Sequence, residues 1–461
     1  MGSIDSRLDE ICRQHQALLL REDEENITIA VTGAPSPLLL EALRFADQRQ
    51  IEVEEWPQAR LEQQRAVTPR AEESAGMPAA SVAALIDRVL LHAFQRRASD
   101  IHIEPCARGM QVRLRIDGVL QPLQTFSAAQ QAPLIARLKI LANLDIAERR
   151  LPQDGQFSLQ LQGEQAAFRL STLPVRRGEK AVIRLLQSES QDLRLEQLGM
   201  SSAALAHFHR ALAQPQGLIL VTGPTGSGKT FTLYSGLSHL NQPGKNLCSV
   251  EDPVEIPLEG INQTQINPRA GLDFQRVLRA LLRQDPDVIM LGEIRDTESA
   301  EIAVKAAQTG HLVLSTLHTN STTETLTRLR QMGIPGYLLA SALRLVIAQR
   351  LVRRLCPRCR SPAEKIDGLP ARLWPGSLQN WQATGCDHCF SGYYGRLALF
   401  ELLPINADLQ AAIAADAGSE ALIALAQRQN LTSLLASGFH AVHQGETSLA
   451  EVYRVIGIDH E

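Results

Sequence analysis

A glycine-rich loop near the middle of the chain joins a short apolar segment to a run of helix-forming residues. The apolar segment, residues 218–222, reads LILVT, and the loop after it, residues 223–230, reads GPTGSGKT. A strand, a loop of the form GxxxxGK[ST] and a helix in this order form the context in which such a loop binds phosphate. These units are typical of parallel sheets that are covered by helices on both faces. The loop therefore predicts an α/β domain around it.

The residue types of the loop suit a magnesium-bound triphosphate. Its glycines let the backbone curl so that N–H groups surround the phosphates. Lys229 adds a mobile positive charge, and Thr230 places a hydroxyl where Mg²⁺ can bind. The alternative is a glycine-rich turn that binds nothing, but the strand, the lysine and the threonine together argue against it. We therefore predict that ATP and Mg²⁺ bind to Gly223, Pro224, Thr225, Gly226, Ser227, Gly228, Lys229 and Thr230.

A second apolar segment, residues 288–291, reads VIML and is followed by Gly292 and Glu293. Open parallel sheets bind ligands at the C-terminal edge of their strands, which is where the phosphate loop also lies. A carboxylate at that edge can polarise a water for attack on the terminal phosphate, so we predict Glu293 as the general base. The alternative is an acidic residue that begins a surface loop with Arg295 and Asp296.

A predicted helix at residues 275–284 carries a cationic face just before this strand. Arg279 and Arg283 lie one turn apart on that face, while leucines and a valine form the opposite face. Paired guanidinium groups suit a polyanionic phosphate, so both arginines are candidate ATP contacts. A solvated charged face is the alternative.

Carboxylates and histidines flank two further predicted strands. Glu251, Asp252 and Glu255 lie at the end of a predicted strand and are candidates to orient water around Mg²⁺. His311 and His318 lie on either side of an apolar strand-like segment, and we assign them to phosphate sensing by hydrogen bonding. An ordinary core or surface histidine is the alternative at either position.

Two CxxC pairs near residues 356–389 indicate a metal site. Cys356 and Cys359 are separated from Cys386 and Cys389 by 26 residues that carry glycine and proline but little helical pattern. Each pair can present two thiolates to one tetrahedral Zn²⁺, and four cysteines leave no position open for catalysis. We therefore predict a structural zinc, with a redox pair or unmetallated thiols as the alternatives.

The composition favours a multidomain protein in the cytoplasm. A chain of 461 residues is too long for one compact core. The formal net charge of −4 provides no basic surplus that would concentrate the chain on nucleic acid. The longest apolar stretches, such as residues 338–347, are short and interrupted by Arg344, so we expect no membrane span and no signal peptide.

Shifts in composition predict six segments. A strand at 27–31 and a helix-like run at 38–47 indicate a small α/β unit, and the residues after it lack apolar periodicity. A helix at 81–95 and five alternating segments then indicate an α+β domain. We expect an N-terminal α/β domain at 1–58, a linker at 59–80, an α+β domain at 81–190, an ATPase domain at 191–354, the zinc loop at 355–396 and a helical C-terminal part at 397–461.

Four sequence blocks occur in a characteristic order. They read GPTGSGKT, VEDPVE, DVIMLGEIRD and TGHLVLSTLHTN, and RASDIHIEP, RLRIDG and RLPQDG precede them. Over residues 81–461 the chain resembles the secretion ATPase superfamily that powers type II secretion and type IV pili. The two CxxC pairs make it similar to the assembly branch of that family, the GspE- and PilB-like ATPases.

This resemblance implies a RecA-like P-loop ATPase domain, a homo-hexamer and ATP bound between the two main domains. It also implies phosphate contacts from Arg169 and Arg184 of the preceding domain. The expected function is an ATP-hydrolysing motor that is peripheral to the inner membrane and acts on a platform protein there, with no nucleic acid as partner. A nucleic-acid motor of RecA-like fold and a DNA-uptake pilus motor remain alternatives. Residues 1–58 are short for the regulatory domain of the family.

Overall fold

The computed structural model describes most of the chain and divides it into two compact units. The described residues are 8, 12, 17–22, 26–33, 35, 39–40, 43, 49–58, 79–186, 192–371, 373–429 and 431–457. The units are residues 1–82 and 83–461. No helix in the described part of the chain combines the length and the apolar composition that a bilayer crossing requires.

The first unit contains a small three-stranded sheet. Its strands are β1 (Leu18–Glu22), β2 (Asn26–Val31) and β3 (Gln50–Glu55), in the order β1-β2-β3. β2 pairs with β1 antiparallel and with β3 parallel. The strand predicted at 27–31 is therefore confirmed as β2. The helix predicted at 38–47 and the linker predicted at 59–80 lie largely outside the described residues.

A six-stranded antiparallel sheet follows in the second unit, in the order β6-β5-β4-β9-β8-β7. Its elements are α4 (Ala79–Gln95), β4 (Ala98–Cys106), β5 (Gly109–Ile116), β6 (Val119–Phe126), α5 (Gln131–Leu141), β7 (Gln153–Leu161), β8 (Glu164–Val175) and β9 (Gly178–Leu186). The helix and the five strands predicted here are confirmed. The prediction missed β6, because Pro122 interrupts its pattern, and an edge strand tolerates such a proline.

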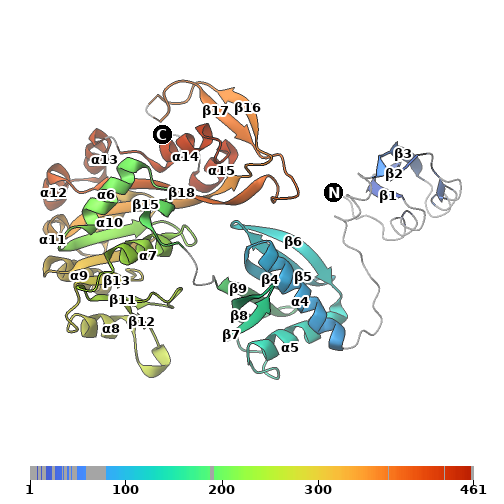
Figure 1. Cartoon of the computed structure of the whole chain (residues 1–461), viewed down its shortest axis with the longest axis horizontal. Coiled ribbons are helices and arrows are strands. Elements are labelled where there is room, and N and C mark those ends of the chain that lie inside the picture. The colour runs from blue at the N-terminus through green and yellow to red at the C-terminus, as the bar shows by residue number, and fades with distance from the viewer. Residues whose placement is uncertain are drawn as a thin grey trace. The chain divides into compact units, whose positions relative to one another are not determined.

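A seven-stranded sheet forms the centre of the remaining chain (Figure 1). Its strands are β12 (Asn262–Gln265), β11 (Leu247–Glu251), β13 (Val288–Leu291), β14 (Leu312–Leu317), β10 (Gly217–Thr222), β15 (Leu343–Leu355) and β18 (Tyr393–Pro404), in that order. All neighbours pair parallel except β15 and β18. The surrounding helices are α6 (Ser202–Leu212), α7 (Lys229–Leu240), α8 (Phe274–Leu281), α9 (Thr297–Gln308), α10 (Thr322–Gln331) and α11 (Gly336–Ala342).

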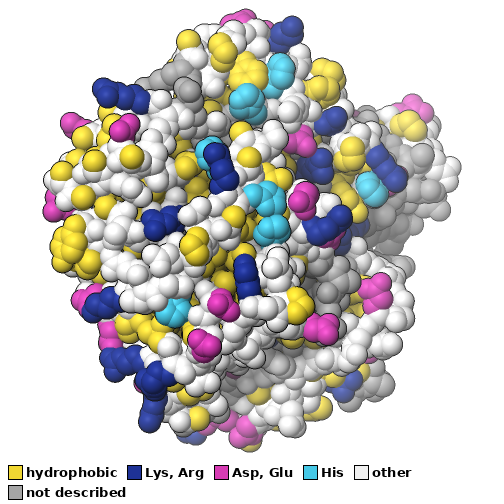
Figure 2. Space-filling model, turned by 60° about the vertical axis from the view of Figure 1, so that its left-hand side comes forward, with side chains coloured by type: hydrophobic (Ala, Val, Ile, Leu, Met, Phe, Trp, Pro, Cys, Tyr) yellow, Lys and Arg dark blue, Asp and Glu magenta, His cyan; other side chains and the backbone are white. Residues whose placement is uncertain are grey.

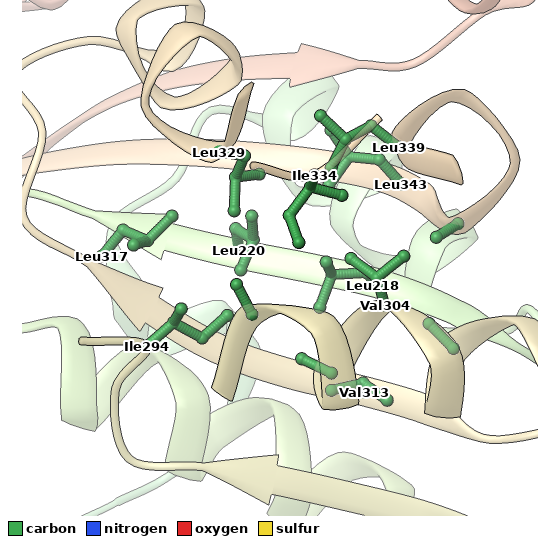
Figure 3. Close-up of a cluster of buried hydrophobic side chains, with 14 of the residues drawn as sticks. Leu218, Leu220, Ile294, Val304, Val313, Leu317, Leu329, Ile334, Leu339 and Leu343 are labelled. Atoms are coloured by element: carbon green, nitrogen blue, oxygen red, sulfur yellow. The ribbon is translucent and has the colours of Figure 1, made fainter. Parts of the chain in front are cut away.

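Both faces of this sheet are buried, as the apolar runs predict. Alternate residues of β10 enter different clusters: Leu218 and Leu220 belong to one, and Ile219 and Val221 to the other. The helices that contribute to the first cluster include α8, α9, α10 and α11, and those that contribute to the second include α6 and α7. Figure 3 shows Leu218 and Leu220 among side chains of the first cluster. β10 and its loop are thus fixed from two sides.

The C-terminal part is mostly helical from Ala407 onward, as predicted, but the prediction for residues 397–461 missed the strand at its start. The long strand β18 occupies its first eight residues, and its pairing with β15 could not be read from its local pattern. The other elements are β16 (Ser361–Ile366), β17 (Leu378–Gln382), α12 (Ala407–Ala414), α13 (Ser419–Arg428), α14 (Leu434–His443) and α15 (Leu449–Ile456), with short 3-10 turns at Ala128–Gln130, Leu195–Leu198 and Pro268–Ala270. Ser448 caps α15, because its hydroxyl accepts from the N–H of Glu451.

Candidate functional site

Three parallel strands end at the same edge of the large sheet. β10 leads into the glycine-rich loop, β13 leads to Glu293 and β14 leads to His318. The register pairs Thr222 of β10 with Leu317 of β14, and Leu291 of β13 with Ser315. The predicted convergence of these segments follows from this register.

The backbone of the glycine-rich loop, residues 223–230, has positive φ angles, which favour glycine, at all three of its glycines. Gly223 has a φ of 149°, and a Cβ there would lie 2.5 Å from the carbonyl oxygen of Gln349. Gly228 has a φ of 88° and lies at the start of α7. Lys229 is 8% exposed, and its Nζ donates to the carbonyls of Gly223 (2.7 Å) and Pro224 (3.0 Å). A phosphate oxygen can replace these two acceptors.

Two hydroxyls of this loop, those of Ser227 and Thr230, are placed to contact a ligand. The buried Oγ of Ser227 has no hydrogen-bond partner in the described structure. Buried polar groups are nearly always paired, so an unpaired one marks a place for an external ligand. Thr230 is exposed in the first turn of α7, as a hydroxyl that meets a metal ion should be.

Both the backbone around Glu293 and its carboxylate are held in place. Gly292 donates to Val250 (2.8 Å) and Ile294 donates to Thr316 (2.9 Å), so the backbone on both sides of Glu293 is fixed between β11 and β14. The carboxylate is paired with Arg295, and His318 Nε2 lies 3.1 Å from its Oε2.

Charge links Glu293 to the glycine-rich loop. Burial alone would raise the pKa of Glu293, but the bonds with Arg295 and His318 outweigh burial and lower this pKa below its ordinary value. The carboxylate is therefore ionised at neutral pH. Its charge in turn acts on Lys229, whose pKa it raises against the larger effect of burial. Lys229 and Glu293 thus lie within electrostatic reach of each other.

The three predicted magnesium carboxylates divide into two kinds. Asp252 and Glu255 are exposed, and Asp252 Oδ2 lies 3.8 Å from Arg295. Glu251 is only 3% exposed and accepts hydrogen bonds from Tyr234, Ser249 and Gln263. The structure therefore places Glu251 inside the domain, away from the position of a solvent-facing metal ligand.

Two arginines and one histidine among the predicted site residues make their contacts away from the glycine-rich loop and Glu293. Arg279 pairs with Glu298, and Arg283 donates to the carbonyl of Arg279 (3.0 Å). Both line a cavity of about 400 Å³ that is bordered by α8 and its N-cap Asp273. His311 precedes β14 and contacts the carbonyl of Ala306, so it lies at the opposite end of that strand from His318.

Arg169 and Arg184 are neighbours in the antiparallel sheet. They pair across β8 and β9, and the flanking Phe168 and Leu170 are fully buried on the other face. Arg184 Nε donates to Asp100 Oδ1 at 3.0 Å. The two guanidinium groups therefore share the less buried face of the sheet.

Sequence reasoning missed residues that support the glycine-rich loop from β15. Gln349 Oε1 accepts from Thr232 of α7 at 2.7 Å. Arg350 is 6% exposed and donates to the carbonyl of Asn320 at 3.0 Å, just after His318. Burial lowers the pKa of Arg350. A polar pair directly after the apolar run of residues 345–348 was the signal that could have identified both residues.

The four predicted zinc ligands form one cluster. Their sulfur atoms all lie within 4.8 Å of one another. Sγ–Sγ distances are 3.8 Å for Cys356 and Cys386, 3.6 Å for Cys359 and Cys389, and 3.6 Å for Cys386 and Cys389. Zn–S bonds of about 2.3 Å in a tetrahedron imply edges of about 3.8 Å, so the cluster fits Zn²⁺.

A cavity of about 410 Å³ adjoins Arg295 and His318. It extends from the end of β14 to α10, which contributes Glu324, Thr327, Arg328 and Gln331 to its lining. This volume lies within the range of small-molecule sites. The polar surroundings of Glu293 thus continue toward α10.

Comparison with known proteins gives consistent matches. Residues 77–454 match the family model described as type II/IV secretion system protein. The HofB homolog of Escherichia coli K12, a protein transport protein, is 55% identical over 458 residues, which are 98% of this chain and 99% of that protein. The type IV pilus assembly ATPase PilB of Pseudomonas aeruginosa is 47% identical over 383 residues, or 82% of this chain and 68% of that one.

A solved structure agrees with these sequence matches. The pilus retraction motor PilT with bound ADP has a TM-score of 0.53 and 27% identity, and the match covers 80% of this chain and 95% of that chain.

Proposed function

Because this chain belongs to the type II/IV secretion system protein family and is an ATPase of that family, we propose that it powers the assembly of a type IV pilus or a type II secretion pseudopilus. In this proposal ATP-driven domain motion acts on a platform protein of the inner membrane. The protein then works in the cytoplasm, peripheral to that membrane, as a homo-hexamer. The GspE- and PilB-like resemblance is confirmed by the family match together with the 47% identity to the pilus assembly ATPase PilB.

The observation that supports this function most directly is the meeting of Lys229, Thr230 and Glu293 at one sheet edge. N–H groups of the loop and the ammonium of Lys229 bind the phosphates. The Thr230 hydroxyl and the waters oriented by Asp252 and Glu255 would hold Mg²⁺, which prefers oxygen ligands and keeps part of its water shell. Bound there, Mg²⁺ neutralises charge that develops on the terminal phosphates.

Glu293 acts as the proton acceptor for the attacking water. Its lowered pKa keeps it ionised, so it is ready to orient that water at neutral pH. His318 and Arg295 hold the carboxylate, and His318 is placed to respond when the terminal phosphate leaves. The site thus connects phosphate cleavage to the loop after β14.

Movement follows if distant arginines meet phosphate in only one arrangement of the domains. Arg169 and Arg184 are the candidates, because their guanidinium groups share one face of the antiparallel sheet. A guanidinium that reaches the terminal phosphate only when the domains close makes closure dependent on ATP. We assign the cysteine cluster to a structural Zn²⁺.

Two measurements test the function at different levels. Purified protein should release phosphate from ATP, and Lys229→Ala or Glu293→Gln should each lower the rate about 100-fold or more. In the source organism, a deletion strain should lose filament assembly or secretion, and wild-type protein should restore it where Glu293→Gln does not. Activity that survives both substitutions together would exclude this site.

The nucleic-acid motor would show itself in the same assay. It predicts hydrolysis that DNA stimulates and that falls steeply with salt. On the face drawn in Figure 2, Lys and Arg side chains lie in small groups between acidic and uncoloured ones. The family match and the net charge of −4 favour the secretion motor instead.

A further inference from the structure

A buried hydroxyl connects the helix of the phosphate loop to the segment that carries the magnesium carboxylates. Tyr234 lies on α7 and is fully buried, and Glu251 is the last residue of β11. The Tyr234 hydroxyl donates to Glu251 Oε2 and accepts from the backbone N–H of Glu255 at 3.2 Å. One side chain therefore holds both ends of residues 251–255.

The second carboxylate oxygen of Glu251 is also occupied. Its Oε1 accepts from Ser249 Oγ at 2.5 Å and from Gln263 Nε2 at 3.1 Å. Gln263 Nε2 also donates to the carbonyl of Ile256 at 3.1 Å. Three protein donors occupy most of the acceptor sites of Glu251, and its side chain is almost unexposed, so it offers little to a solvent-facing metal ion. It is an anchor, and Asp252 and Glu255 are the carboxylates that remain free to reach a metal ion.

The hydrogen bonds of the tyrosine leave it no alternative arrangement. A phenol hydroxyl can donate one hydrogen bond, and Tyr234 donates it to Glu251. The hydroxyl oxygen must therefore accept the hydrogen bond from the N–H of Glu255. Burial, and then the bond to Glu251, raise the pKa of Tyr234 above its ordinary value. The hydroxyl consequently keeps its proton throughout the working pH range. Buried networks in which every group is paired fix a single geometry.

We propose that Tyr234 is a positioning residue for ATP hydrolysis that acts through Glu251 and the backbone of Glu255. By fixing residues 251–255 against α7, it holds Asp252 and Glu255 at a constant distance from Thr230 on the same helix. Mg²⁺ demands nearly octahedral geometry, so a small displacement of these carboxylates weakens the metal site. The same displacement reaches Glu293, because Arg295 is paired with Glu293 and lies 3.8 Å from Asp252.

The test is Tyr234→Phe in the full-length chain, which removes one oxygen and keeps the ring. We expect the Mg²⁺ concentration at half-maximal hydrolysis to rise about fivefold or more and kcat to fall about tenfold, because a displaced catalytic group mainly affects turnover. The KM for ATP at saturating Mg²⁺ should stay within about twofold of wild type. Ser235→Ala is the matched control, since it removes the neighbouring hydroxyl of α7, which bonds only within the helix.

A double variant tests whether the effect passes through Glu251. If Tyr234 and Glu251 act as one unit, Tyr234→Phe with Glu251→Gln should lose no more activity than the worse single variant. Losses that multiply would overturn the proposal, as would a Tyr234→Phe protein whose kcat and Mg²⁺ requirement match wild type within about twofold. Rates are expressed per chain that binds a fluorescent ADP without Mg²⁺. If the loss vanishes on that scale, Tyr234 serves only folding and the proposal fails.

Discussion

Lys229 is buried by the loop that carries it, and few charged side chains lie near its ammonium group. Burial lowers its pKa to about 8, the charge of Glu293 opposes this shift, and the charge of Arg350 adds to it. The folded pKa is below the ordinary value, so the unfolded chain binds more protons above pH 8. This group therefore adds stability as pH rises from about 8 toward its ordinary pKa. Nucleotide affinity should change in the opposite direction, because phosphate needs the cation.

Nucleotide binding should consequently weaken as pH rises through the pKa of Lys229. Between pH 7.5 and 9 we expect the Kd of a fluorescent ATP analogue to rise about eightfold, as a site that needs one proton with a pKa of about 8 requires. Fluorescence titration at fixed ionic strength measures it. Lys229→Arg keeps its charge and should flatten the profile, whereas Lys245→Arg, at an exposed position, should leave it unchanged. A flat wild-type profile would contradict the lowered pKa.

Single residues were predictable wherever a local motif specifies them. Lys229 and Thr230 are fixed by the loop pattern, and Glu293 by the strand before it. Glu251 could not be separated from Asp252 and Glu255, because only the packing of Tyr234 against β11 shows which carboxylate is buried. His311 and His318 looked equivalent for a similar reason: the parallel register decides which end of β14 meets the phosphate loop.

Elements with strong periodicity were predictable, and those defined by distant pairing were not. The apolar runs of β10, β13 and β14 are buried throughout, as a sheet covered on both faces requires. β18 was missed because it pairs with β15 across about forty intervening residues, at the antiparallel edge of the sheet. α8 ends at Leu281, three residues before the predicted end of the helix.

The zinc loop should depend on its metal for order. β15 ends at Leu355, immediately before Cys356, and β16 pairs with β17 between the two cysteine pairs. Metal binding supplies folding free energy to such a loop, so its loss should expose residues 360–385. We expect about one zinc per chain in wild-type protein, and in Cys359→Ser both zinc loss and faster proteolysis in this segment.

Metal analysis and limited proteolysis of the same samples measure both effects. Cys106→Ser is the control, because this cysteine at the end of β4 lies outside the cluster. Zinc-free wild-type protein purified without a chelator would refute the assignment, and so would Cys359→Ser protein with its full zinc content.

At the scale of the whole molecule, the sequence supported a family assignment that the match over residues 77–454 confirms. The order of the four motifs carried that assignment, since each motif alone also occurs in unrelated folds. The large sheet and the antiparallel sheet were predictable from their strand patterns, whereas their division into separate domains stays a prediction. The arrangement of several copies in a ring is a property of assembly, and it needs a measurement on mixtures of chains.

If the subunits of a ring must act together, one inactive subunit should stop ATP hydrolysis by the whole ring. Glu293→Gln removes the proton acceptor while leaving the phosphate loop and its nucleotide contacts in place, so this variant should enter rings and stall them. If six subunits must act in turn, an equal mixture with wild type should retain about one-sixtieth of the wild-type rate, whereas independent subunits would retain about half.

Phosphate release at fixed total protein concentration, across the full range of mixing ratios, distinguishes the two cases. Light scattering on each mixture must show that the mass of the assembly is unchanged, and the same mixtures combined without time for subunit exchange serve as the control. A straight line between the two pure proteins would mean that each chain hydrolyses ATP alone, and coupled motion around a ring would then have to be abandoned. A curve far below that line supports coupling, because one uncleaved ATP then holds its neighbours in their current arrangement.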